Sequence, residues 1–129
     1  MKIIPMAVFS VLFLITNTAL LAASHHPQEF LKTISGSPNE GEQIVSHYCA
    51  NCHAPDPLIK LGAPRTGMLS DWEWRLKKGI ERVVFNSSEG LNAMPPRGGC
   101  FECTDTQLLL AIEAMLPDAL RTKEKSGGK

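Results

Sequence analysis

The chain has 129 residues, with 13 basic and 13 acidic side chains. This length supports one domain around one modest core. The balanced charge lacks the clustered basic excess that is typical of nucleic-acid binding, so no nucleic-acid partner is predicted. Aromatic residues make up only 6% of the chain, so the core has little bulky side-chain material.

The first 23 residues have the pattern of a signal peptide. Lys2 gives a short positive start, an apolar run covers residues 6–15, and small residues precede a cleavage site after Ala23. An uncleaved membrane anchor is the alternative, but Asn17 interrupts the apolar run and no basic cluster follows it. We therefore predict export to the periplasm, where thiols end in disulfides or in other covalent bonds.

Residues 24–36 form a polar lead-in with no clear periodicity. The first helix is predicted to start with a capping box in which Ser37 and Glu40 satisfy free backbone N–H groups. Apolar residues then share one face as far as Cys49. Gly41 weakens this helix, and a glycine at such a position often marks the close approach of another backbone.

The middle of the chain alternates loops and short helices. Residues 54–67 are rich in proline and glycine and are predicted to form a loop. A second capping box at residues 70–73 is predicted to open a short helix that ends at Gly79. Residues 80–87 are predicted to form another short helix, which ends near Gly90.

The last part of the domain is predicted to be a loop and a final helix. Residues 91–103 are dense in proline and glycine, and a third capping box at residues 104–107 starts the helix. The buried stripe of this helix is formed by Leu108, Ile112, Met115 and Leu116. No strand pattern occurs, so the predicted fold class is all-α, with a single domain over residues 37–121 and a flexible tail over residues 122–129.

Residues 49–53 read C-A-N-C-H, which is the attachment signature for haem c. The spacing has a mechanical reason, because Cys49 and Cys52 lie on one helical turn and can each add to a vinyl group of the same porphyrin. The adjacent His53 then presents its imidazole to the iron. The motif predicts one covalently bound haem c with His53 as an iron ligand.

The cysteines have two alternative interpretations. A C-x-x-C pair can be a redox dithiol, but that interpretation expects a βαβ context that this sequence lacks. A second C-x-x-C, at Cys100 and Cys103, raises the alternative of a zinc-stapled interaction module with four cysteine ligands. The two pairs lie much farther apart than the roughly 15–20 residues usual for zinc sites.

The second axial ligand is predicted to be Met94. It is followed by two prolines, which stiffen the segment and fix the direction of the thioether. Met115 fits the buried stripe of the last helix, and Met68 follows His53 by only fifteen residues, which is a short path around a porphyrin. His47 precedes the motif on the same helix and is expected to point away from the iron.

With these residues in place, the chain resembles the class I cytochromes c, and specifically the cytochrome c5 family. The resemblance covers residues 36–116 and rests on G-E-Q-I at 41–44 leading to the C-A-N-C-H motif, and on G-A-P at 62–64. Its most specific part is the segment 90–103, in which a second C-x-x-C follows the methionine. The resemblance implies a small cytochrome c fold, with N- and C-terminal helices crossing and short helices wrapped around the haem.

The resemblance also implies roles for residues around the haem. The carbonyl of Pro64 is expected to accept a hydrogen bond from His53 and to fix its tautomer. Trp72 and Arg75 match positions near a haem propionate in such proteins. An amphipathic helix with one buried tryptophan and one solvated arginine is the open alternative for this pair.

The same resemblance implies a disulfide between Cys100 and Cys103. So small a ring gains little loop-closure entropy, so its expected role is to shape the methionine loop. The chain departs from the wider class at Val45 and Ala114, where relatives commonly carry aromatic residues. This departure predicts a less well filled crossing of the two terminal helices.

The predicted function is single-electron transfer in a respiratory chain, between a reductase and an oxidase. Ligation by His53 and Met94 fills both axial positions and raises the potential, so no catalysis is expected. A haem enzyme or gas sensor with a displaceable methionine is the alternative. Arg65 and Arg97, with Lys60 nearby, are candidates for steering an acidic partner, or are ordinary solvated charges. Peripheral membrane association and a monomeric or weakly dimeric state are compatible with the sequence.

Overall fold

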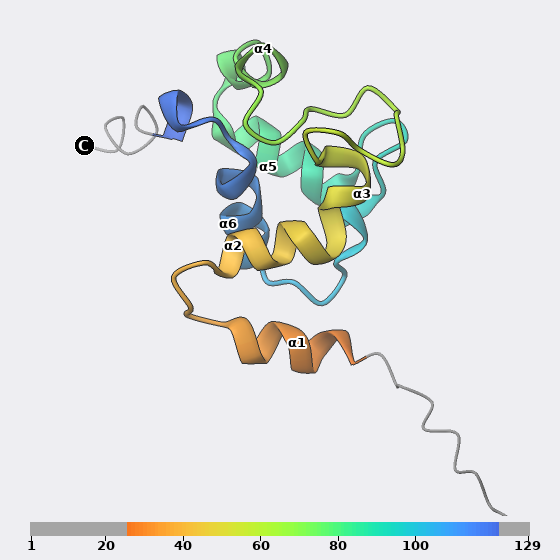
Figure 1. Ribbon diagram of the computed structural model, residues 1–129, viewed down its shortest axis with the longest axis vertical. Coiled ribbons are helices and arrows are strands. Elements are labelled where there is room, and N and C mark those ends of the chain that lie inside the picture. The colour runs from red at the N-terminus through yellow and green to blue at the C-terminus, as the bar shows by residue number, and fades with distance from the viewer. Residues whose placement is uncertain (1–25, 122–129) are drawn as a thin grey trace, which may run out of the picture.

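The computed structural model describes residues 26–121, and Figure 1 shows these residues as a set of short helices joined by loops. No strand occurs among them apart from an isolated bridge between Leu91 and Met94, so the predicted all-α class is confirmed. The helices are α1 (Pro27–Ile34), α2 (Glu40–Ile44), η1 (Val45–Cys49), α3 (Ala50–His53), α4 (Leu69–Trp72), η2 (Arg75–Lys78), α5 (Ile80–Glu89), η3 (Pro96–Gly99) and α6 (Asp105–Met115).

None of the helices within residues 26–121 has both the length and the apolar character that a membrane crossing requires. The predicted signal peptide at residues 1–23 and the predicted tail at residues 122–129 lie outside the described residues.

The crossing of α2 and α6 is the largest helix–helix interface of the described residues (Figure 1). A Cβ atom added to Gly41 would lie 2.3 Å from the carbonyl oxygen of Leu110 and 3.2 Å from Cβ of Ala114. The two backbones therefore meet at a point that only glycine allows, which confirms the close approach predicted from Gly41. The predicted crossing of the N- and C-terminal helices of the domain is thereby confirmed as well.

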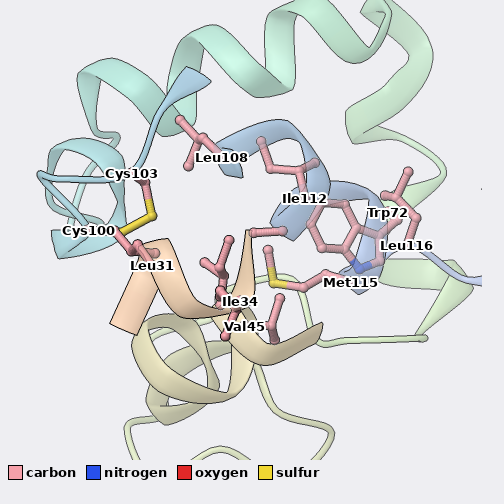
Figure 2. Close-up of a cluster of buried hydrophobic side chains, with 12 residues drawn as sticks. Leu31, Ile34, Val45, Trp72, Cys100, Cys103, Leu108, Ile112, Met115 and Leu116 are labelled. Carbon is pink, nitrogen blue, oxygen red and sulfur yellow. A yellow bond between two sulfur atoms is a disulfide. The ribbon is translucent and has the colours of Figure 1, made fainter. Parts of the chain in front are cut away.

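The core packs around this crossing (Figure 2). The predicted stripe of α6 is confirmed, since Leu108, Ile112, Met115 and Leu116 are all buried. Trp72 from α4 packs against the stripe and is only 2% exposed.

Residues 27–34 form the helix α1, so the prediction of an irregular lead-in is wrong. Pro27 opens the helix, where a missing N–H is harmless. Leu31 and Ile34 lie one helical turn apart and are both buried in the core, as Figure 2 shows. Burial of this short apolar face explains why the segment is helical in spite of its polar composition.

The next helix, α2, starts later than predicted, and the capping box of Ser37 and Glu40 is wrong. The N-cap is Asn39, with no side-chain capping bond. The Glu40 carboxylate is buried and accepts one hydrogen bond from the Gly36 N–H, at 2.7 Å, and one from Nε2 of Gln107, at 2.9 Å. One local backbone N–H and one distant side chain therefore engage the carboxylate, and the predicted capping box does not form. Beyond α2 the chain continues through the π-helical turn η1 into α3.

The capping box predicted at residues 70–73 is also wrong. Ser70 lies inside α4, whose N-cap is Met68. The hydroxyl of Ser70 donates to the carboxylate of Asp71 at 3.3 Å instead of capping the helix.

Other predicted boundaries are confirmed. Gly79 ends η2 and Gly90 ends α5, both with a positive φ that glycine adopts without strain. Thr104 caps α6 through the N–H of Gln107 at 3.1 Å, and the Gln107 side chain accepts from the N–H of Thr104 at 3.0 Å. This reciprocal pair is the predicted capping box, and it fixes where the final helix begins.

Candidate functional site

A cavity of about 360 Å³ opens between the C-A-N-C-H turn and the loop that carries Met94. Cys49, Cys52, His53, Pro64 and Met94 all line it. Its remaining wall is largely apolar, with Ile59, Leu61, Leu91, Leu108, Ile112 and Met115. Its volume and mainly apolar lining, with a few polar groups, are typical of a cofactor site.

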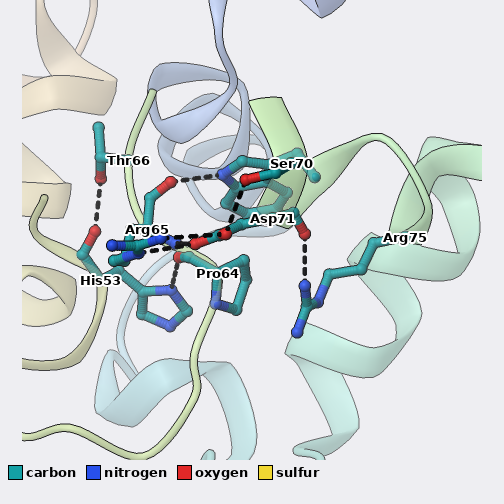
Figure 3. Close-up of polar contacts among 8 residues, drawn as sticks. His53, Pro64, Arg65, Thr66, Ser70, Asp71 and Arg75 are labelled. Carbon is teal, nitrogen blue, oxygen red and sulfur yellow. Dashed lines mark hydrogen bonds and ion pairs between the residues drawn. The ribbon is translucent and has the colours of Figure 1, made fainter. Parts of the chain in front are cut away.

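His53 is 6% exposed, and its Nδ1–H donates to the carbonyl of Pro64 at 2.8 Å (Figure 3). Because a carbonyl only accepts, this bond places the proton on Nδ1 and leaves a lone pair on Nε2. Burial lowers the pKa of His53, the bond to Pro64 opposes this shift, and the charge of Arg75 adds to it. The result is a neutral imidazole, which is the form that binds a metal.

The segment after Pro64 is held by several hydrogen bonds, which Figure 3 shows. The backbone N–H and the Nε of Arg65 both donate to Oδ2 of Asp71, at 3.0 and 2.9 Å. The indole N–H of Trp72 donates to the carbonyl of Arg65 at 2.8 Å. The N–H and the hydroxyl of Thr66 both donate to the carbonyl of His53, at 2.7 and 2.8 Å. The loop is therefore tied directly to the residue whose ring lines the cavity.

Trp72 and Arg75 differ in their relation to the cavity. Trp72 is not among the lining residues, and its only polar group is already bound to Arg65. Its position matches the alternative prediction, in which Trp72 is the buried tryptophan of an amphipathic helix. Arg75 does line the cavity, where its guanidinium donates to the carbonyl of Asp71 and lies 4.1 Å from the ring centroid of Trp74.

The loop that carries Met94 starts at Gly90, which has no room for a side chain. A Cβ atom there would lie 2.9 Å from both the carbonyl oxygen of Met94 and the nitrogen of Pro96. Met94 and Leu91 exchange two backbone hydrogen bonds, at 2.9 and 3.1 Å. A tight turn thus presents the thioether to the cavity.

Cys100 and Cys103 form a disulfide with a Cα–Cα distance of 5.4 Å, as the family resemblance implies. Both residues are buried. Cys49 and Cys52 are not paired with each other and have free thiols. Because Cys100 and Cys103 are joined to each other, the four cysteines do not form a zinc site. Residues 26–121 contain no group of three or more His, Cys, Asp or Glu side chains that could hold a metal ion.

Two of the three competing ligands lie outside the cavity lining. Met68 is 38% exposed and does not line the cavity. The ring of His47 stacks on Phe30 with a centroid distance of 4.3 Å and is also outside the cavity lining. Met115 does line the cavity, but it is buried within the stripe of α6.

Tyr48 is one of several lining residues that the sequence did not predict. Tyr48 lies on the cavity wall, and its hydroxyl is buried with no hydrogen-bond partner among the described side chains and backbone. Burial and the nearby Glu102 carboxylate raise its pKa. The sequence feature that could have predicted this placement is the position of Tyr48 next to Cys49, which puts its ring beside the attachment turn.

The residues of the cavity fit a covalent haem. Two free thiols on one helical turn, a buried imidazole with its Nε2 lone pair available, and a methionine on the facing loop share one apolar space. Burial raises the pKa of the Cys49 thiol to about 11, with Cys52 adding to the shift, so this wall favours uncharged sulfur. A thioether is uncharged and suits such a wall.

A helical domain with this site defines a class I c-type cytochrome. The family model described as cytochrome C oxidase, cbb3-type, subunit III, matches residues 36–113. Cytochrome c5 of Azotobacter vinelandii is 38% identical over 82 residues, which are 62% of this chain and 95% of the relative. The chain belongs to the cytochrome c5 family.

Two further relatives agree with this assignment. Cytochrome c5 of Ectopseudomonas mendocina is 33% identical over 62% of this chain and 91% of its own length. Cytochrome c-555 of Prosthecochloris aestuarii is 31% identical over 62% of this chain and 86% of its own length. No solved structure gives a significant match. Family membership makes the chain a monohaem c-type electron carrier with redox protein partners, and not an enzyme.

Proposed function

We propose that Cys49 and Cys52 carry the two thioether bonds to the haem and that His53 and Met94 are its axial ligands. The observation that carries this proposal is that one cavity is lined by all four residues. In this arrangement the protein is an exported respiratory carrier that accepts an electron from a reductase and passes it to an oxidase.

A haem held by these residues would supply the one-electron redox chemistry. The Nδ1–H of His53 is held by Pro64, so the imidazole cannot rotate or present the wrong nitrogen. The thioether of Met94 favours the reduced state and raises the potential. With both His53 and Met94 bound to the iron, no coordination position would be open to oxygen or peroxide, which would suit electron transfer.

The rim of the cavity suggests where partners dock. Ile59, Leu61 and Leu91 line the cavity and are 46%, 57% and 51% exposed. Of the charges predicted to steer the partner, Arg65 pairs with Asp71 and Arg97 is mostly buried. Lys60 is exposed and pairs with the exposed carboxylate of Asp56. We therefore expect an apolar contact in place of the arginine docking hypothesis.

This docking mode has a direct test. Electron transfer with a redox partner should depend only weakly on salt, and Leu61→Asp should slow it without changing the absorption spectrum. A steep salt dependence, with an unchanged rate for Leu61→Asp, would point to charge steering instead.

Export is supported by the sequence pattern of residues 1–23. The measurement is the mass of the protein recovered from the periplasm. A mature chain that begins at Ser24 is expected, whereas a full-length chain in the membrane fraction would favour a retained anchor.

The spectrum tests the site itself. Oxidised and reduced absorption spectra should be recorded for protein made alongside a cytochrome c maturation system. A reduced haem c α-band, together with the weak oxidised-state band of methionine-ligated iron, is expected. Haem c without the methionine band would remove Met94 from the proposal and keep the cytochrome.

A further inference from the structure

The residue after the two prolines of the Met94 loop has an unusual backbone. Arg97 adopts a φ of 58° and a ψ of 17°, in the left-handed region that residues with a Cβ atom rarely enter. Gly98 and Gly99 follow with φ values of 61° and 84°. Glycine adopts these angles without strain, but arginine does not, so the Arg97 side chain is expected to compensate for its backbone.

The Arg97 guanidinium reaches three other segments of the fold. It donates to the carbonyl of Cys103, which belongs to the disulfide loop, and to Oδ1 of Asp105 in the first turn of α6 at 3.0 Å. A longer contact of 3.5 Å reaches the hydroxyl of Ser88 in α5. The Arg97 side chain is only 19% exposed.

These contacts differ in how much they are expected to stabilise the turn. The carboxylate of Asp105 is 91% exposed, and exposed ion pairs contribute little. The bond to the Cys103 carbonyl is charge-assisted and partly buried, so it is expected to dominate. Arg97 therefore ties the Met94 loop to the disulfide loop mainly through a main-chain acceptor.

The same residue is connected to Met94 through the backbone. The N–H of Gly98 donates to the carbonyl of Pro95 at 3.0 Å, and the N–H of Cys100 donates to the carbonyl of Arg97 at 3.1 Å. A Cβ atom added to Gly98 would lie 3.6 Å from Cε of Met94, so the methionine methyl rests against this turn. Arg97 and Gly98 also line the cavity.

We propose that Arg97 is a positioning residue for Met94: its guanidinium holds the left-handed turn at residues 97–99 against the disulfide loop, and this turn keeps the thioether in the cavity. This inference rests on the proposed function, in which Met94 ligates the iron. Loss of the guanidinium should raise the fraction of protein in which the methionine is detached.

Two variants separate the effect of the Arg97 guanidinium from the effect of its backbone conformation. Arg97→Gly removes the guanidinium but adopts the left-handed conformation freely. Arg97→Lys keeps the charge but has no planar fork to reach two acceptors at once. If the turn alone positioned Met94, Arg97→Gly would behave as the unaltered protein. We expect both variants to weaken ligation.

Arg121 provides the matched control. It also donates to two main-chain carbonyls, of Leu116 at 2.8 Å and of Ala114 at 2.9 Å, and it also pairs with an exposed carboxylate, Asp118. It does not line the cavity. Arg121→Lys should therefore change general stability without changing ligation at the iron.

The experiment titrates imidazole into the oxidised, haem-loaded full chain and follows absorption. An external ligand binds only when the methionine is detached, so its apparent affinity follows that population. We expect affinity to rise about tenfold or more in Arg97→Gly and Arg97→Lys, and to stay unchanged in Arg121→Lys. Far-ultraviolet circular dichroism should show intact helices in each variant.

The outcomes are distinct. Affinities in both Arg97 variants that equal that of the unaltered protein would overturn the positioning role while leaving Met94 as the ligand. A rise in Arg97→Lys alone would assign the effect to the backbone and also overturn it. If the unaltered protein lacks the methionine band and binds carbon monoxide when reduced, the proposed ligation fails and this inference fails with it.

Discussion

The two loops that line the cavity are held in different ways. The segment after Pro64 is fixed by several hydrogen bonds from separate donors, among them Arg65 and Trp72. The segment around Met94 contains left-handed residues, including Asn92 and Arg97. Its backbone hydrogen bonds lie within the segment itself, and the disulfide and the Arg97 guanidinium add its other constraints.

This difference predicts which of the two loops moves away from the cavity more easily. On the His53 side, loss of one bond leaves others that hold the same atoms. On the Met94 side, the backbone is less favourable and its attachments are few. Ligand exchange at the iron should therefore occur by detachment of Met94, while His53 stays in place.

Met94→Ala is expected to have the largest effect on function. The potential should fall by roughly 0.1 V or more, because axial ligands tune haem potentials over about 0.8 V. The reduced protein should also bind carbon monoxide. Protein-film voltammetry measures the first effect, and Met68→Ala should leave the potential unchanged. An unchanged potential in Met94→Ala would remove the functional contrast between the two loops.

Replacing both Cys100 and Cys103 with serine should weaken the Met94 side further. The chain-entropy estimate for so small a loop is about 2 kcal/mol of the free energy of unfolding. Denaturant titration measures that loss. The methionine band should disappear at lower denaturant than the helical signal, since the loop detaches before the domain unfolds. Simultaneous loss of both signals would show that the loop is no weaker than the rest.

Low pH should destabilise the other loop, which is the segment after Pro64. The hydrogen bonds from the Arg65 side chain and backbone lower the pKa of Asp71 to about 2. A folded-state pKa below the unfolded value of about 3.9 means that this stabilisation is complete above pH 4. It is lost as the pH falls from about 4 to about 2.

Comparison with Asp71→Asn tests the predicted direction of this pH dependence. The variant should be less stable than the unaltered protein at pH 6, and the difference should shrink at pH 2–3. Thermal unfolding at several pH values measures it. A difference that stays constant across this range would mean that the Asp71 charge contributes nothing.

Thr66→Val should have the smallest effect. The hydroxyl and the N–H of Thr66 both donate to the carbonyl of His53, so the backbone bond remains when the hydroxyl is removed. Stability should fall by no more than about 1 kcal/mol, and the potential should not change. A shift of the potential would show that the His53 side is less redundant than its hydrogen bonds indicate.

Much of the fold was predictable from local sequence. The capping box at Thr104, the terminating glycines at 79 and 90 and the stripe of α6 depend on neighbours in the chain, and each is confirmed. Gly41 was informative because a glycine inside a helix has few uses other than close packing.

Two of the errors share one physical cause. Glu40 was expected to cap its own helix, but Gln107, far along the chain, engages its carboxylate. The helix α1 was missed because its stabilisation comes from burial of Leu31 and Ile34 against distant residues. The contacts of such side chains are set by partners that are distant in the chain, and a single sequence does not reveal those partners.

The most direct test of the proposed ligation is nuclear magnetic resonance of the reduced, haem-loaded protein with labelled methionine methyl groups. A methyl group held against the haem face is shifted strongly upfield by the ring current. Single replacements of Met68, Met94 and Met115 by leucine assign the signals. We predict that the most upfield methyl signal disappears only in Met94→Leu. Its persistence in that variant, or its loss in Met68→Leu or Met115→Leu, would contradict ligation by Met94.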